Sequence, residues 1–127
     1  MLEKFTCSAQ LPASDFGRAK KFYKETLGFK IAEEMDAGAR IDAGKGTFFW
    51  VYPSEFAGTN KATAIAFDVD NVEKIVDDLT KKGITFEQFD LPYGKTDKRG
   101  IAEMEGWKGA FFKDSEGNII GLGEMTG

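Results

Sequence analysis

The side chains that most often carry enzymatic chemistry are scarce in this chain. Its 127 residues include no histidine and a single cysteine, Cys7. Histidine is the commonest protein ligand for zinc, copper and iron, and it is the side chain best suited to proton transfer near neutral pH. A thiolate metal cluster needs several cysteines. The sequence therefore predicts no metal site and no cofactor, and acid–base chemistry would fall to a carboxylate or a tyrosine.

Acidic residues could supply oxygen ligands for a hard cation, and we interpret most of them as solvated strand or turn surface. Asp68 is the exception, because it shares a face of its expected strand with Ala64 and Ala66. We keep Asp68 as the candidate catalytic residue, a general base if partial burial raises its pKa. The acidic groups considered are Asp68 and Asp70, Glu103 and Glu105, and Glu33, Glu34 and Asp36.

Composition describes one soluble globular domain over residues 1–127. Hydrophobic residues make up 42% of the chain and charged residues 30%, which is typical of a folded protein. No apolar run approaches the length of a membrane span or a secretory signal, so we expect neither. One unpaired cysteine without an export signal indicates the cytoplasm. The net charge of −4 disfavours a nucleic-acid partner.

Two helices are expected, and their spacing indicates an internal repeat. The first begins at Ser14 or Asp15 and ends at Gly28, and the second begins at Asp70 or Asn71 and ends at Gly83. Asp15 and Asp70 are the same distance apart as Gly28 and Gly83. We therefore predict two modules of similar length, about 1–60 and about 61–127.

Each helix is flanked by segments that alternate apolar and polar residues, as strands do. Phe5 to Leu11 precedes the first helix and Thr63 to Val69 precedes the second. Cys7 then lies beside Phe5 on the helix-packed face, as a buried inert thiol. Each module is thus expected to be β-α-β-β-β, an α+β fold. The strands expected after the helices are Lys30 to Met35, Ala39 to Ala43 and Thr47 to Tyr52, and then Thr85 to Phe89, Gly109 to Lys113 and Ile119 to Glu124.

This pattern resembles the vicinal oxygen chelate superfamily, which includes glyoxalase I, bleomycin-resistance proteins and extradiol dioxygenases. The most specific match is the capped helix that ends in Phe22 to Phe29, and Asp114 to Gly121 is similar to the family's hairpin into the last strand. The resemblance covers nearly the whole chain, apart from the loop Leu91 to Gly106. It implies paired β-α-β-β-β modules curled around a cleft, and a homodimer.

The resemblance also implies where metal-dependent members place four ligands, one on each of four strands. Those positions fall at Ser8, at Phe49 or Trp50, at Ala64 and at Gly121. Neither an alanine, a glycine nor an aromatic ring of this kind can hold a transition metal. We therefore expect the metal chemistry of glyoxalase I and the dioxygenases to be absent.

Small residues at these positions leave room in the expected cleft, and the chain supplies many aromatic residues around it. An apolar hollow with a few polar groups suits a small molecule, and a planar ligand would stack on an indole. The alternative is that neighbouring side chains fill the space. The expected ligand-binding residues are Ser8, Gln10, Phe49, Trp50, Ala64, Trp107 and Gly121.

Two functions remain open from the sequence. The first is a metal-independent protein that binds a small molecule and sequesters an aromatic or amphipathic compound, as bleomycin-resistance members do. The second is a metal-free enzyme of the lyase or isomerase type that uses carboxylate acid–base chemistry. The loop Leu91 to Gly106 is either a lid over the cleft or variable surface.

Overall fold

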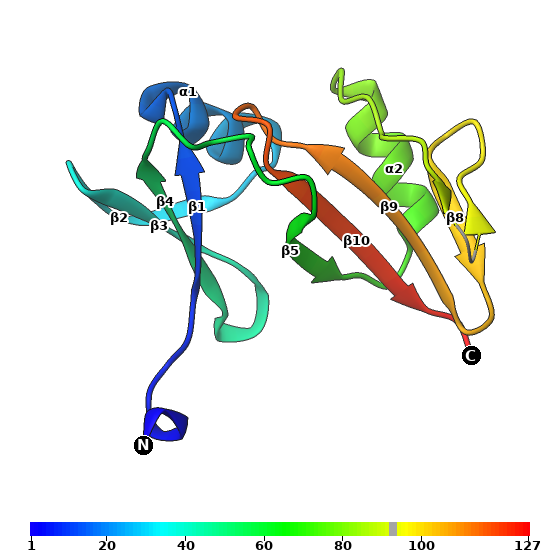
Figure 1. The fold of residues 1–127 in the computed structure, drawn as a ribbon, viewed down its shortest axis with the longest axis horizontal. Coiled ribbons are helices and arrows are strands. Elements are labelled where there is room, and N and C mark those ends of the chain that lie inside the picture. The colour runs from blue at the N-terminus through cyan, green and yellow to red at the C-terminus, as the bar shows by residue number, and fades with distance from the viewer. Residues whose placement is uncertain (92–93) are drawn as a thin grey trace. The chain divides into compact units, whose positions relative to one another are not determined.

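The computed structural model of the chain divides into two compact units, Met1–Ala57 and Gly58–Gly127. The structure describes residues 1–91 and 94–127. Each unit consists of a four-stranded sheet with helical structure packed on it (Figure 1), and the predicted α+β class is confirmed. Within the described residues, no helix is long and apolar enough to span a bilayer.

The two sheets share one topology, which confirms the predicted repeat. Sheet A of the first unit has the order β1-β4-β3-β2, and sheet B of the second has the order β5-β10-β9-β8. In each, the first strand of the module pairs in parallel with the last, and the remaining pairs are antiparallel. The strands are β1 Ala9–Ala13, β2 Lys30–Met35, β3 Gly38–Asp42, β4 Phe48–Pro53, β5 Thr63–Asp68, β8 Ile101–Met104, β9 Trp107–Lys113 and β10 Ile119–Met125.

The helical segment of the first unit has two parts. The α-helix α1, Phe16–Lys21, begins where the Asp15 carboxylate accepts a hydrogen bond from the Arg18 amide at 3.0 Å. It continues as a π-helix, η2, over Phe22–Thr26, and the chain then leaves through Gly28, whose φ of 78° favours glycine. This segment buries Tyr23, which is fully inaccessible.

Tyr23 is the centre of the aromatic core of the first unit. Its ring packs edge-on against Phe49 of β4 with centroids 5.4 Å apart, and Phe29 contacts both rings. Val51, two residues along β4 from Phe49, is also buried, as is Leu11, its partner on β1. One face of sheet A is therefore covered by α1 and η2.

The helix of the second unit, α2, spans Val72–Lys81. Its first turn is capped twice: the Asn71 side chain accepts from the Lys74 amide at 3.1 Å, and Glu124 of β10 accepts from the Val72 amide at 2.9 Å. Val72 and Val76 are buried against β9 and β10, beside which α2 lies in Figure 1. One face of sheet B is thus covered by α2.

The first strand begins later than predicted. It starts at Ala9 rather than Phe5, because the chain before it forms a short 3₁₀ turn, η1 Leu2–Lys4, followed by irregular backbone. Phe5 is 69% exposed, and Cys7 is exposed rather than buried beneath the helix. The predicted alternation is nevertheless correct in phase, since Leu11 faces the core.

The strand expected over Thr85 to Phe89 is reduced to one bridge, between Phe86 and Phe112. The pairing along β9 resumes at Ile101, opposite Ala110, so β8 lies inside the segment that we expected to be a loop. Residues 88–91 and 94–100 lie outside this edge strand as an excursion, and they include the two-residue strands β6, Asp90–Leu91, and β7, Gly94–Lys95. Two residues of the expected lid, 92 and 93, lie outside the described part of the chain.

Asp97 holds the turn that ends this excursion and leads into β8. Its carboxylate accepts hydrogen bonds from the amides of Arg99 at 2.8 Å and Ile101 at 2.9 Å. Burial works to raise the pKa of Asp97, but these amides outweigh it and hold the pKa below its usual value.

A lowered pKa in the folded state means that the charged form of Asp97 stabilises the fold at neutral pH. That contribution is present above the pKa of the unfolded chain and is lost as the pH falls through the lower, folded value. We therefore expect Asp97→Asn to lower the melting temperature at pH 6 and to lower it less at pH 2.5, which is below the usual pKa of an aspartate. Thermal melts of both proteins across this range are the measurement, and an equal deficit at both pH values would contradict the assignment.

Candidate functional site

The helix-free face of each sheet, called its open face below, carries exposed aromatic residues. On sheet A these are Phe48, Trp50 and Tyr52, which alternate along β4 with the buried Phe49 and Val51 and are all half-buried. Gly38 lies beside the indole, since a Cβ built on this glycine would be in ordinary van der Waals contact with Cε3 of Trp50, at 3.5 Å. The open face of sheet A is therefore a row of rings along one strand.

Charged residues flank that row on its β3 side. Arg40 is the partner of Trp50 across the β3–β4 pair, and its guanidinium lies 4.2 Å from the centroid of Phe48. Its Nε is 3.3 Å from the Asp42 carboxylate, and this buried nitrogen makes no hydrogen bond within the described residues. Because Lys30 and Glu33 pair with these two residues from β2, the charges on this face balance.

The open face of sheet B is more apolar and is built on small residues. A Cβ placed on Gly109 would lie 2.0 Å from Cη2 of Trp107, and one on Gly123 would lie 3.0 Å from its Nε1. The indole therefore lies flat across these two glycines. A Cβ on Gly121 would lie 3.3 Å from the ring of Phe111.

These rings partly fill the space that the small residues leave, which was the alternative to an empty hollow. They remain accessible themselves, since Trp107 and Phe111 are half-buried. Phe111 also contacts Phe89 of the excursion, with ring centroids 5.6 Å apart. The result is an aromatic platform, made of Trp107, Phe111 and Phe89, on the open face of sheet B.

The structure separates the expected ligand-binding residues into three sets. Phe49 lies on the helix-covered face, packed between Tyr23 and Phe29, so the expectation that it faces a ligand is corrected. Gln10 pairs with Trp50 on sheet A, and its side-chain amide reaches the Ser8 hydroxyl at 3.5 Å. The residues on the open face of sheet B are Ala64, Trp107 and Gly121.

Sequence reasoning missed three residues that shape these faces. Arg40, Phe111 and Gly109 are absent from the expected site residues. The alternation along β9 places Phe111 and Gly109 on the side of Trp107, and that signal was available. No sequence pattern predicted that the indole ring packs flat against Gly109.

The four positions that the resemblance assigns to metal ligands do not suit a metal. Because Phe49 is in the core, Trp50 is the β4 residue that reaches the open face, and Ser8 is the single oxygen donor among the four. The described residues include no group of three or more Cys, Asp or Glu side chains placed to hold an ion. The donor set therefore does not fit a transition metal.

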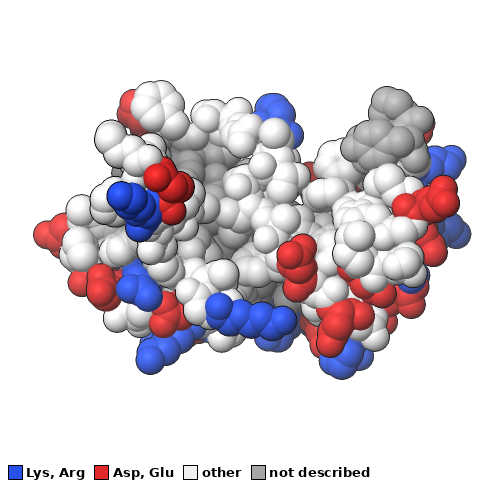
Figure 2. Space-filling model, turned by 90° about the horizontal axis from the view of Figure 1, so that it is seen from below, with Lys and Arg blue, Asp and Glu red and all other residues white. Residues whose placement is uncertain are grey.

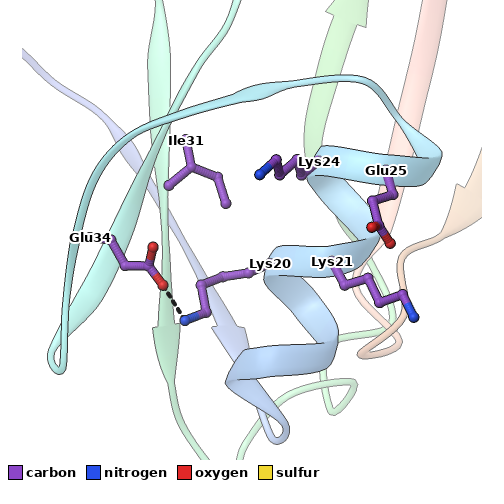
Figure 3. A pocket seen from close by; sticks show the side chains of 6 residues that line it. All are labelled: Lys20, Lys21, Lys24, Glu25, Ile31 and Glu34. Carbon is purple, nitrogen blue, oxygen red and sulfur yellow. Dashed lines mark hydrogen bonds and ion pairs between the residues drawn. The ribbon is translucent and has the colours of Figure 1, made fainter.

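The structure also has a pocket of about 220 Å³ on the helix side of β2, away from all the expected site residues. Figure 3 shows Lys20, Lys21 and Lys24 reaching it from the helical segment, with Lys20 bonded to Glu34 of β2. Long charged side chains form most of its walls. We favour the open faces as the functional site, because they present aromatic rings, whereas Ile31 is the one apolar residue among the described residues that line this pocket.

The distribution of surface charge does not favour nucleic acid as a partner. In Figure 2, basic side chains are interspersed with acidic ones over the face of the molecule that is shown. Nucleic-acid-binding domains usually gather their basic residues into a patch or stripe. This face offers no such feature.

A family model described as Glyoxalase/Bleomycin resistance protein/Dioxygenase superfamily matches residues 7–122. Among solved structures, a glyoxalase family protein from Enterococcus faecalis is 24% identical, with a TM-score of 0.70 over 98% of this chain and 100% of that one. TnmS3, an antibiotic binding protein from Streptomyces sp. CB03234, is 22% identical, with a TM-score of 0.64 over 96% and 98% of the two chains. Lactoylglutathione lyase from Agrobacterium tumefaciens is 14% identical, with a TM-score of 0.67 over 94% and 92%. No curated protein matches the sequence.

Proposed function

Because the chain belongs to the Glyoxalase/Bleomycin resistance protein/Dioxygenase superfamily, we propose that it binds and sequesters an aromatic or amphipathic small molecule without a metal. The observation that carries the proposal is the aromatic platform of sheet B. Trp107 and Phe111 lie on glycines and remain half-exposed, and such rings bind planar ligands by stacking and by burying apolar area.

Two further observations support sequestration over metal catalysis. The residues at the ligand positions of metal-dependent members do not suit a metal, as described above. The fold is also that of TnmS3, whose structure is described as an antibiotic binding protein. That protein is similar in fold. It supports small-molecule binding by analogy and does not identify the ligand.

A thermal-shift screen of aromatic metabolites and antibiotics, combined with elemental analysis of protein purified without chelators, tests the proposal. A compound present at 100 times its Kd should stabilise the fold by about 2.7 kcal/mol, which raises the melting temperature by several degrees. Trp107→Ala should reduce the shift in melting temperature. Trp50→Ala is the matched control, because it removes the same side chain from the other sheet. Stoichiometric transition metal in the purified protein, or no stabilising compound across the panel, would argue against it.

A metal-free enzyme is the second candidate, and one observation favours it: Asp68 lies on the open face of sheet B, opposite Gly123. Asp68 is exposed rather than partly buried as we expected, and its carboxylate would act as a general base toward a ligand on the platform. Recovery of the bound ligand distinguishes the two functions. Sequestration returns it unchanged, whereas a lyase or isomerase returns a product whose formation Asp68→Asn abolishes.

The proposal also covers the assembly and location of the protein. Family likeness supports one domain made of both modules and a homodimer, and the net charge of −4 supports a partner other than nucleic acid. The unpaired Cys7 is consistent with a reducing cytoplasm. Light scattering during gel filtration would test the dimer, which should have twice the chain mass of 14.0 kDa.

A further inference from the structure

We infer that the ligand of the sheet B platform carries a positively charged amino group beside its aromatic ring, and that Asp68 recognises this group. The inference rests on the proposed function and narrows its ligand class. It begins from the position of Asp68. This residue is the partner of Gly123 across the β5–β10 pair, and paired residues on adjacent strands lie about 5 Å apart.

Gly123 also supports the indole of Trp107. A Cβ built on this glycine would lie 3.0 Å from the indole Nε1, so the edge of the ring lies above β10, next to the strand that holds Asp68. The carboxylate and the ring are thus neighbours on one face. A cation bound over the outer face of the indole, near this edge, would contact the negative face of the ring and lie toward the carboxylate.

The charge of Asp68 is uncompensated within the part of the chain that the structure describes. Asp68 is exposed, and its carboxylate has neither a hydrogen bond nor an ion pair among the described residues. The other charged strand residue of this open face is Lys113, at the far end of β9, and its amine is 3.5 Å from the Glu87 carboxylate. Sheet A differs, because its open face carries balanced charges.

Two physical effects then favour a cation over a neutral group of the same shape. The carboxylate attracts it directly, and the indole attracts it through the negative face of its ring. Both effects are modest at a surface, because water and salt screen them. We expect them to strengthen binding by roughly tenfold over a neutral ligand of the same shape.

The test compares 2-naphthylmethylamine, which is protonated at pH 7, with 2-naphthalenemethanol, which is neutral and has the same shape. The chain has two tryptophans, one on each sheet, so two indole N–H signals in a ¹H–¹⁵N spectrum report separately on the two faces. Trp107→Phe and Trp50→Phe assign them. Titrating the full chain with each compound gives the affinity at each face.

The amine should shift the Trp107 signal with a Kd about tenfold lower than the alcohol, and higher salt should weaken the amine alone. Asp68→Asn should remove the preference and leave the affinity for the alcohol unchanged. Asp70→Asn is the matched control, because it removes the same charge from an exposed position just beyond the strand.

Equal affinities for the two compounds, or a preference that survives in Asp68→Asn, would overturn the inference and leave the proposed function standing. If neither compound shifts Trp107 and the wider screen also fails, the proposed function itself is contradicted. The two failures are thereby distinguishable.

Discussion

Replacing Asp114 with alanine is expected to lower the free energy of unfolding by about 3 kcal/mol. Asp114 is buried in the turn between β9 and β10, where its Oδ1 accepts from the amides of Glu116 at 2.9 Å and Asn118 at 2.8 Å. Its Oδ2 accepts from the Asn118 side chain at 2.9 Å. The alanine variant leaves these buried donors without their acceptor, and unsatisfied buried donors are costly.

Urea unfolding followed by circular dichroism measures this change, and the melting temperature should fall by about 10 °C. Asp114→Asn is the control, because it keeps an acceptor oxygen at the same position and should lose less than half as much. A turn that tolerated alanine as well as asparagine would show that water replaces the carboxylate there.

Replacing Gly109 with alanine is expected to weaken the binding of an aromatic ligand on sheet B by at least about fivefold, at a cost of about 2 kcal/mol in stability. The added methyl would lie 2.0 Å from the Trp107 ring and 2.9 Å from the backbone oxygen of Leu122. The strand cannot yield easily, so the indole must leave the sheet. The platform then loses its flat surface, although every aromatic residue is still present.

Gly44→Ala is the matched control, because a Cβ at that glycine meets no atom within 4 Å. Isothermal titration with the best compound from the screen measures the affinities of both variants. The Trp107 indole signal shows directly whether the ring has moved. An unchanged affinity in Gly109→Ala, with the ring displaced, would exclude the indole from the site.

Much of the fold was predictable because it is periodic and repeated. The helix caps and the glycines that end both helices are local signals, and β2 has the bounds that we predicted from the glycine-bearing turns around it. Two errors have physical causes. The apolar alternation of Phe5 and Cys7 continues that of β1, but those residues have no strand beside them, since β1 pairs with β4 from Ala9 onward.

The second error concerns β8. Ile101–Met104 is short and follows a polar, glycine-containing segment. Its pairing with β9 is a local hairpin that turns at Glu105 and Gly106, and the glycine there was a turn signal that the sequence offered. The strand was missed because it is only four residues long and the charged, glycine-containing segment before it made the whole region resemble a loop.

The candidate site was predicted in part. Alternation correctly grouped Ala64, Gly121 and Trp107 on one face, because the period of a strand is fixed. It could not choose between Phe49 and Trp50, which are adjacent and similar in character, and the choice depends on contacts with Tyr23 and Phe29. Side-chain conformation, such as the indole lying on Gly109, is set by packing and lies beyond any sequence pattern.

The interrupted edge strand has a consequence for comparing this chain with its relatives. Phe86 lies opposite Phe112, the Glu87 amide bonds the Phe111 carbonyl at 2.8 Å, and Ile101 lies opposite Ala110. The pairing register with β9 is therefore continuous from Glu87 to Ile101, and the residues between them do not change it. The excursion can grow or shrink in evolution without shifting a single pairing, and an alignment that spreads its gaps elsewhere would misplace Trp107 and every site residue after it.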